Sequence, residues 1–271
     1  MPRLYIISGC NGSGKTTASY TLLPELLDCS EFVNSDEFAK SLSPFAPESA
    51  YILASRFMLK KVQYLFQRRE DFCIETTLAT RSLLKMVRSA QEQGYFVTII
   101  YFWLNSPDMA VERVAARVAA GGHHIPEDTI RRRYHSGLDY FFRYYMPECD
   151  KWILADNSCP PFHVVAEGTR KGMQVRDPKL YSQIQESLTE TPEAPARVQD
   201  VAQEVAQAIC DCLGVAPGET TSDGMFTLEF CECIGLCDTS PAIMINDAVY
   251  TNLTPQSAVN LIKAYQQGGA R

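Results

Sequence analysis

Near its N-terminus the 271-residue chain reads Gly9-Cys10-Asn11-Gly12-Ser13-Gly14-Lys15-Thr16, which fits the pattern G-x-x-x-x-G-K-[ST]. A strand-like apolar run at residues 4–8 precedes this motif, and a helical pattern begins at Lys15. A glycine-rich turn between a strand and a helix lets successive backbone N–H groups point at phosphate oxygens. The motif therefore predicts a nucleoside-triphosphate site, a P-loop. The alternative is a glycine-rich turn with a surface lysine.

The residues of the P-loop have distinct expected roles. Lys15 reaches the β- and γ-phosphates, and Thr16 offers its hydroxyl to Mg²⁺ as a metal ligand. We therefore expect ATP and Mg²⁺ as cofactors. The residues expected to bind the nucleotide are Gly9, Asn11, Gly12, Ser13, Gly14, Lys15, Thr16 and Thr17.

Beyond the P-loop, short apolar runs alternate with longer helical patterns, which is typical of an α/β domain with a mainly parallel sheet. Further strands are expected at residues 31–33, 72–75, 96–103 and 151–155. Helices are expected at 50–69, at 82–93 and on both sides of Gly121-Gly122. We predict an α/β fold for residues 1–188, with a P-loop kinase-like parallel sheet flanked by helices.

A second, smaller domain is expected after a linker. Residues 189–196 read TETPEAPA, and their two prolines and small residues cannot propagate a helix. Beyond them the patterns predict a helix at 197–213, a strand at 226–232, a hairpin at 242–245 and 248–250, and a helix at 255–266. Residues 197–271 should therefore form a small α+β module.

The composition narrows the class of protein. A net charge of −7 argues against a nucleic-acid or membrane-surface binder, so neither partner is expected. The chain opens directly on a strand-like run without a signal-peptide pattern, and we expect a soluble, cytoplasmic protein. Its ten cysteines are then expected to be thiols, metal ligands or buried residues rather than disulfides. Five of them crowd into the C-terminal part, at Cys210, Cys212, Cys231, Cys233 and Cys237.

Two carboxylates follow predicted strands at the edge where open α/β sheets bind ligands. A kinase needs a group that accepts the proton of a substrate hydroxyl, and Asp36 is the candidate base. Its alternative role is an N-cap within Asn34-Ser35-Asp36-Glu37. Glu75, with Thr76, ends an apolar strand and suits the binding of substrate hydroxyls or amides, although an ordinary strand-terminal residue is the alternative.

A lid over the triphosphate is expected between Arg113 and Tyr134. Arginines would stabilise the charge of the transferred phosphoryl group, and glycines would give mobility. The segment holds both, with Gly121-Gly122-His123-His124 between the arginines. The histidines have no cysteines at metal-ligand spacing and are expected to be lid residues. Most of the arginines should be solvated and one or two should contact phosphate, from the set Arg113, Arg117, Arg131, Arg132 and Arg133.

Several ordered motifs together resemble the zeta toxin family over about residues 1–175. They are the P-loop, Asn34-Ser35-Asp36, Glu75-Thr76-Thr77-Leu78, the segment from Gly121 to Tyr134, and Asp156-Asn157-Ser158. The resemblance implies an ATP-dependent kinase that phosphorylates UDP-N-acetylglucosamine, a nucleotide sugar, and is held in check by an antitoxin protein. By that similarity Lys15 is the phosphate lysine, Asp36 the catalytic base and Glu75 a substrate-binding carboxylate, while Arg113 and Arg117 clamp phosphate as catalytic arginines.

The C-terminal part, about residues 198–268, resembles the thioredoxin-like [2Fe-2S] subunit of NADH:quinone oxidoreductase. The resemblance is carried by Cys233-Ile234-Gly235-Leu236-Cys237, with Pro217-Gly218-Glu219-Thr220-Thr221 upstream and Asn252-Leu253-Thr254-Pro255 downstream. It implies Cys233 and Cys237 as iron–sulfur ligands. The family's first cysteine pair, a C-x4-C, has no counterpart here. Three interpretations stay open: a [2Fe-2S] cluster completed by other cysteines or another chain, a truncated redox docking module, and a remnant without redox activity.

Three functions follow as hypotheses. The first is a P-loop kinase that phosphorylates a hydroxyl of a small molecule, a UDP-N-acetylamino sugar. The alternative is an iron–sulfur redox module of the NADH dehydrogenase type, regulated by a nucleotide-binding domain. A third is a nucleotide-dependent interaction module with negligible catalysis.

Overall fold

The computed structural model describes residues 1–25, 27–44, 50–81, 83–122, 124–189, 197–228, 241–246 and 248–268. The chain divides into two compact units, Met1–Pro192 and Glu193–Arg271. The linker was predicted at 189–196, but Thr189 is still helical and ends the helix Pro178–Thr189. The rest of the predicted linker, 190–196, lies outside the described residues, and the proposed domain boundary stays a prediction. None of the helices in the described ranges has the length and apolar character needed to cross a membrane.

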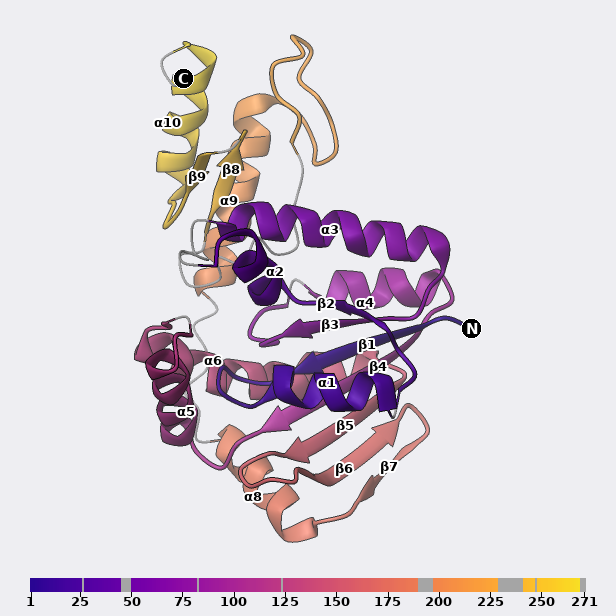
Figure 1. The fold of residues 1–271 in the computed structure, drawn as a ribbon. Helices are drawn as coiled ribbons and strands as arrows, with labels where there is room; N and C mark the ends of the chain where they lie inside the picture. The colour runs from indigo at the N-terminus through magenta and orange to yellow at the C-terminus, as the bar shows by residue number, and fades with distance from the viewer. Residues whose placement is uncertain are drawn as a thin grey trace. The chain divides into compact units, whose positions relative to one another are not determined.

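The first unit is built on a seven-stranded sheet (Figure 1). In spatial order its strands are β2 (Glu31–Val33), β3 (Phe72–Thr76), β1 (Arg3–Ser8), β4 (Phe96–Trp103), β5 (Lys151–Asp156), β6 (His163–Thr169) and β7 (Gly172–Val175). The first five are parallel, and β6 and β7 continue the sheet antiparallel. The five predicted strands are confirmed, with β1 between β3 and β4, so the P-loop leaves the interior of the sheet.

Helices cover the sheet because its central strands are apolar on both faces. On β1, Leu4 and Ile6 belong to one core cluster, whereas Tyr5 and Ile7 belong to another. The helices are α1 (Lys15–Glu25), α2 (Ser35–Leu42), α3 (Tyr51–Arg68), α4 (Leu83–Glu92), α5 (Pro107–Ala119), α6 (Glu127–Tyr140), the π-helix η2 (Phe141–Tyr145), α7 (Met146–Glu148) and α8 (Pro178–Thr189). α3 and α4 pack on the side of Leu4, and α1 packs on the side of Tyr5.

The second unit is a small α+β module, as predicted. It consists of α9 (Arg197–Leu213), the hairpin of β8 (Ile243–Ile245) and β9 (Ala248–Tyr250), and α10 (Pro255–Gln266). Val205 and Ile209 of α9 pack with Ala258 and Ile262 of α10 in its core. The strand expected at 226–232 is wrong for its described part, residues 226–228, where Thr227 forms only an isolated bridge. Residues 229–232 lie outside the described part.

Candidate functional site

The P-loop backbone requires glycine where it passes the sheet and a neighbouring loop. Gly9 has φ 140° and Gly14 has φ 81°, conformations that L side chains rarely adopt. A Cβ on Gly9 would lie 2.3 Å from the carbonyl oxygen of Phe102, and one on Gly14 would lie 2.4 Å from Nδ2 of Asn157. The loop therefore fits closely against β4 and the end of β5.

Two buried polar side chains of the P-loop are suited to phosphate. Lys15 is 7% exposed, and its Nζ donates to the carbonyl oxygen of Cys10 at 2.8 Å. Ser13 is fully buried, and within the described residues its Oγ has no hydrogen-bond partner. A buried hydroxyl without a partner is costly, so a ligand that accepts its hydrogen bond would stabilise the loop. These residues fit the triphosphate that the motif predicts.

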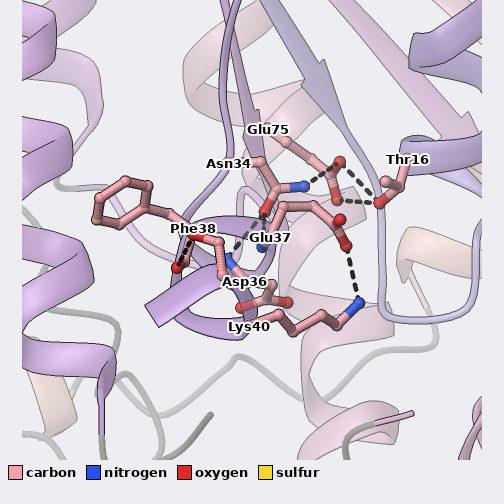
Figure 2. Close-up of polar contacts among 8 residues, drawn as sticks. Thr16, Asn34, Asp36, Glu37, Phe38, Lys40 and Glu75 are labelled. Carbon is pink, nitrogen blue, oxygen red and sulfur yellow. Dashed lines mark hydrogen bonds and ion pairs between the residues drawn. The ribbon is translucent and has the colours of Figure 1, made fainter. Parts of the chain in front are cut away.

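Glu75 lies beside Thr16, the predicted magnesium ligand (Figure 2). The Thr16 hydroxyl is 3.1 Å from Oε1 and 2.9 Å from Oε2 of Glu75, and Asn34 Nδ2 donates to Oε2 at 2.9 Å. Burial raises the pKa of Glu75, and the charges of Asp36 and Glu37 add to that rise, while Lys15 and the Thr16 hydrogen bond oppose it. A cation at Thr16 would relieve the cost of burying this carboxylate.

We expect Glu75→Gln to change how stability depends on pH. Since the folded pKa of Glu75 lies above its ordinary value of about 4.3, the folded chain holds this proton longer than the unfolded chain as pH rises. The free energy of unfolding should therefore fall from about pH 4.3 upward through the raised pKa. Glutamine cannot titrate but can still accept from Asn34, so the variant should gain stability relative to wild type as pH rises.

Urea unfolding at a series of pH values from about 4 upward measures this difference. Glu92→Gln is the control, because Glu92 is an exposed carboxylate on α4 that contributes nothing to the environment of Glu75. A constant difference between wild type and Glu75→Gln over this range would contradict the raised pKa.

Asp36 lies in the first turn of α2, close behind β2. The alternative that Asp36 caps this helix is wrong, because Asn34 is the N-cap and its Oδ1 accepts from the backbone N–H of Asp36 at 2.9 Å and of Glu37 at 3.2 Å. Asp36 is exposed, and no described residue pairs with its carboxylate. One amide, Asn34, therefore contacts both Glu75 and the backbone of Asp36, the two residues whose carboxylates were predicted to act in the site (Figure 2).

Thr76 and Thr17, which were predicted to bind substrate and nucleotide respectively, have no described contact with the other predicted site residues. The Thr76 Oγ1 accepts from the backbone N–H of Leu78 at 3.1 Å, where Leu78 has φ 58°. Thr76 thus shapes the turn that follows β3. Thr17 is exposed at the start of α1. Their predicted binding roles stay predictions.

The arginines of the predicted lid are divided among different partners. Arg113 donates from Nη1 to the carbonyl oxygen of Asn157 at 2.9 Å and from Nη2 to that of Ser158 at 2.7 Å. Arg117 is exposed on α5. Arg131 pairs with Asp108 at 2.6 Å. The phosphate roles of Arg113 and Arg117 stay predictions; His124 is exposed and His123 lies outside the described residues.

Two further residues contact the P-loop and were not predicted to. Arg133 donates from Nη1 to Oδ1 of Asn11 at 3.0 Å. Asn157 donates from Nδ2 to the carbonyl oxygen of Ser13 at 2.7 Å. In the sequence, Arg133 was one of several lid arginines and Asn157 was part of the Asp156-Asn157-Ser158 motif. Neither pattern indicates which side chain contacts the P-loop.

The predicted iron–sulfur ligands Cys233 and Cys237 lie outside the described residues. Of the other C-terminal cysteines, Cys210 and Cys212 are free thiols on α9. Among the residues that the structure describes, no group of three or more His, Cys, Asp or Glu side chains could hold a metal ion.

The part of the chain that contains this site is similar to known proteins. Residues 4–136 match the family described as AAA domain. An uncharacterized protein of Haemophilus influenzae is 33% identical over 127 residues, which are 46% of this chain and 88% of that protein. Residues 4–136 are therefore similar to the AAA domain family. The AAA domain carries the P-loop, Asp36, Glu75 and Arg133.

A second family matches beyond the AAA domain, at residues 193–266, and is described as thioredoxin-like [2Fe-2S] ferredoxin. A subunit of NADH-quinone oxidoreductase from Buchnera aphidicola subsp. Baizongia pistaciae is 52% identical over 54 residues, 20% of this chain and 32% of that protein. A subunit of the Thermus thermophilus oxidoreductase is 34% identical over 70 residues, 26% of this chain and 39% of that protein. The expected thioredoxin-like module is confirmed, and the chain spans about a third of the length of these relatives.

Solved structures share the fold that surrounds the P-loop of the AAA domain. The AvrRxo1-ORF1:AvrRxo1-ORF2 structure with sulphate ions has a TM-score of 0.56 at 16% identity, covering 68% of this chain and 63% of that chain. The AvrRxo1-ORF1:-ORF2 structure with ATP has a TM-score of 0.56 at 16% identity, covering 71% and 66%. These likenesses confirm the predicted fold class, a mainly parallel sheet flanked by helices.

Proposed function

We propose that the protein is an ATP- and Mg²⁺-dependent phosphotransferase of zeta toxin type, whose acceptor is a hydroxyl of a UDP-N-acetylamino sugar. The observation that carries this proposal is the hydrogen-bonded series from Thr16 through Glu75 and Asn34 to the backbone of Asp36. It joins the P-loop to an exposed carboxylate at the carboxyl edge of the sheet. A nucleotide-dependent interaction module would not need such a carboxylate.

The proposed reaction moves the γ-phosphoryl group of ATP onto the acceptor oxygen and releases ADP. Lys15 binds the β- and γ-phosphates, and Asp36 accepts the proton of the acceptor hydroxyl. Thr16 would hold Mg²⁺, which neutralises phosphate charge when bound. Glu75, beside Thr16, would bind the acceptor, which is the role predicted for it from the sequence. Arg133, which donates to Asn11 of the P-loop, would add a positive charge for the phosphates.

Incubation with γ-labelled ATP and a panel of nucleotide sugars tests the proposal. Label should move onto an acceptor of the UDP-N-acetylamino sugar type and require Mg²⁺. If ATP binds but no acceptor in the panel is labelled, the interaction-module hypothesis replaces the kinase. If another sugar nucleotide is labelled instead, the phosphotransferase stands and the acceptor is corrected.

An antitoxin partner is part of the same proposal. The similar AvrRxo1-ORF1:-ORF2 structures are two-component complexes, which supports a protein partner for this chain. Co-purification from the source cells should recover a small protein whose removal raises phosphotransferase activity. An unchanged activity after removal of every bound protein would contradict a restraining partner.

A redox function is the second candidate, favoured by the ferredoxin family match at residues 193–266. The family holds its cluster with four cysteine thiolates. This sequence has no counterpart of the first cysteine pair, so two of the four ligands are missing from their expected positions. Anaerobically purified and reconstituted protein should therefore be colourless and EPR-silent. A [2Fe-2S] absorption and EPR signal that Cys233→Ser removes would establish the redox function instead.

A further inference from the structure

The segment that leaves β3 carries a side-chain cluster outside the contacts described above. A Cβ on Gly137 would lie 2.7 Å from the carbonyl oxygen of Thr77, so this glycine lets α6 approach the segment closely. Further along, the Tyr145 hydroxyl donates to the carbonyl oxygen of Thr80 at 2.5 Å. These two contacts hold the segment against α6 and η2, and they fix the backbone just before Arg81.

The Arg81 guanidinium is exposed and ordered by two tyrosines. Its Cζ lies 4.0 Å from the ring centre of Tyr144 and 5.8 Å from that of Tyr140, and it donates a hydrogen bond to the Tyr144 hydroxyl. Such stacking orders an arginine without neutralising it. Within the described residues Arg81 forms no ion pair, and Asp139 beside Tyr140 is already paired with Arg143.

A second positive charge lies near the same ring. Burial raises the pKa of Tyr140, and the charges of Arg81 and Arg132 both act in the opposite direction. Arg132 is exposed on α6. The charge of Asp139 and the hydroxyl of Tyr144 act in the same direction as burial, so charges of both signs influence this ring.

α6 connects this cluster with the P-loop. Arg133, near the middle of the helix, contacts Asn11. Tyr140 lies 140 − 133 = 7 residues later on the same helix, which is close to two turns and about 10 Å along the axis. The two residues therefore share one face of α6. A ligand lying along this face would extend about 10 Å from the phosphate site toward Arg81.

We propose that Arg81, stacked on Tyr144 beside Tyr140, binds a phosphate group of the acceptor. Guanidinium presents a planar fork of donors that matches phosphate oxygens, and the tyrosines hold that fork in place. The acceptor is then a phosphate-bearing molecule rather than a free sugar. This inference rests on the proposed phosphotransferase function and assigns it an acceptor subsite.

The test uses the full chain with its nucleotide site saturated by a non-hydrolysable ATP analogue, so that probes cannot occupy the P-loop. UDP-N-acetylglucosamine and GDP-mannose are titrated beside N-acetylglucosamine and mannose. Wild type should bind a nucleotide sugar far more tightly than its free sugar. Arg81→Gln should weaken that binding by about 10- to 100-fold and leave the affinity for the ATP analogue unchanged.

Arg68→Gln is the matched control, because Arg68 is also exposed and stacks on a tyrosine, with Cζ 5.6 Å from the ring centre of Tyr64. It ends α3 and pairs with Glu70, so the control should bind like wild type. The subsite is refuted if Arg81→Gln binds like wild type, or if wild type with analogue bound takes up neither nucleotide sugar. If the analogue itself does not bind, the proposed function fails and the subsite falls with it.

Discussion

Lys15→Ala should lower the rate of phosphoryl transfer by at least about 100-fold, because it removes the charge that stabilises the transferring phosphates. The side chain is 7% exposed, and its hydrogen bond within the described structure goes to a single carbonyl oxygen, that of Cys10. The fold should therefore survive the substitution. Steady-state release of ADP measures the rate, and circular dichroism checks the fold.

The control for this substitution is Lys85→Ala, an exposed lysine on α4. It removes the same charge from the chain, so the net charge of the two variants is equal. The control should keep the wild-type rate. If Lys15→Ala keeps the wild-type rate, the P-loop has no role in phosphoryl transfer.

Asp36→Asn should lower phosphoryl transfer by about 100- to 10,000-fold, the range typical of a general base. The amide keeps the shape of the carboxylate but cannot accept the acceptor proton. Since Asn34 caps α2 through the backbone of Asp36, the substitution leaves the helix start intact. The affinity for ATP should change little, and equilibrium binding of a labelled ATP analogue measures it.

Glu37→Gln is the matched control, because it neutralises the neighbouring carboxylate in the same helical turn. Glu37 is already engaged in an ion pair with Lys40 at 2.7 Å (Figure 2). This variant should transfer phosphate at close to the wild-type rate. Equal losses in both variants would show that the charge of the turn matters rather than a base at Asp36.

The parallel core of the first unit could be predicted because its strands are apolar runs bounded by turn residues. Phe96–Trp103 is buried along nearly its whole length, so its pattern is that of a strand covered on both faces. β6 and β7 were not predicted, because they lie at the edge of the sheet and mix exposed and buried residues. α2 was also missed, since eight residues give little periodicity and its start depends on the cap by Asn34.

The site was predictable where the chemistry is local to one motif. Lys15 and Thr16 follow from the P-loop spacing, and the positions of Asp36 and Glu75 follow from strand ends. Arg133 could not be chosen from the sequence, because its contact with Asn11 joins residues 122 apart and depends on how α6 is rotated. The same holds for Arg81, whose order comes from tyrosines on η2 and α6.

The most direct measurement of the central proposal compares ADP formed with phosphorylated acceptor formed, by mass spectrometry of one reaction containing ATP, Mg²⁺ and UDP-N-acetylglucosamine. A kinase with Asp36 as its base should give one phosphorylated acceptor for each ADP, and Asp36→Asn should lose both products together. Formation of ADP and free phosphate without any phosphorylated acceptor would contradict phosphoryl transfer and identify an ATP hydrolase.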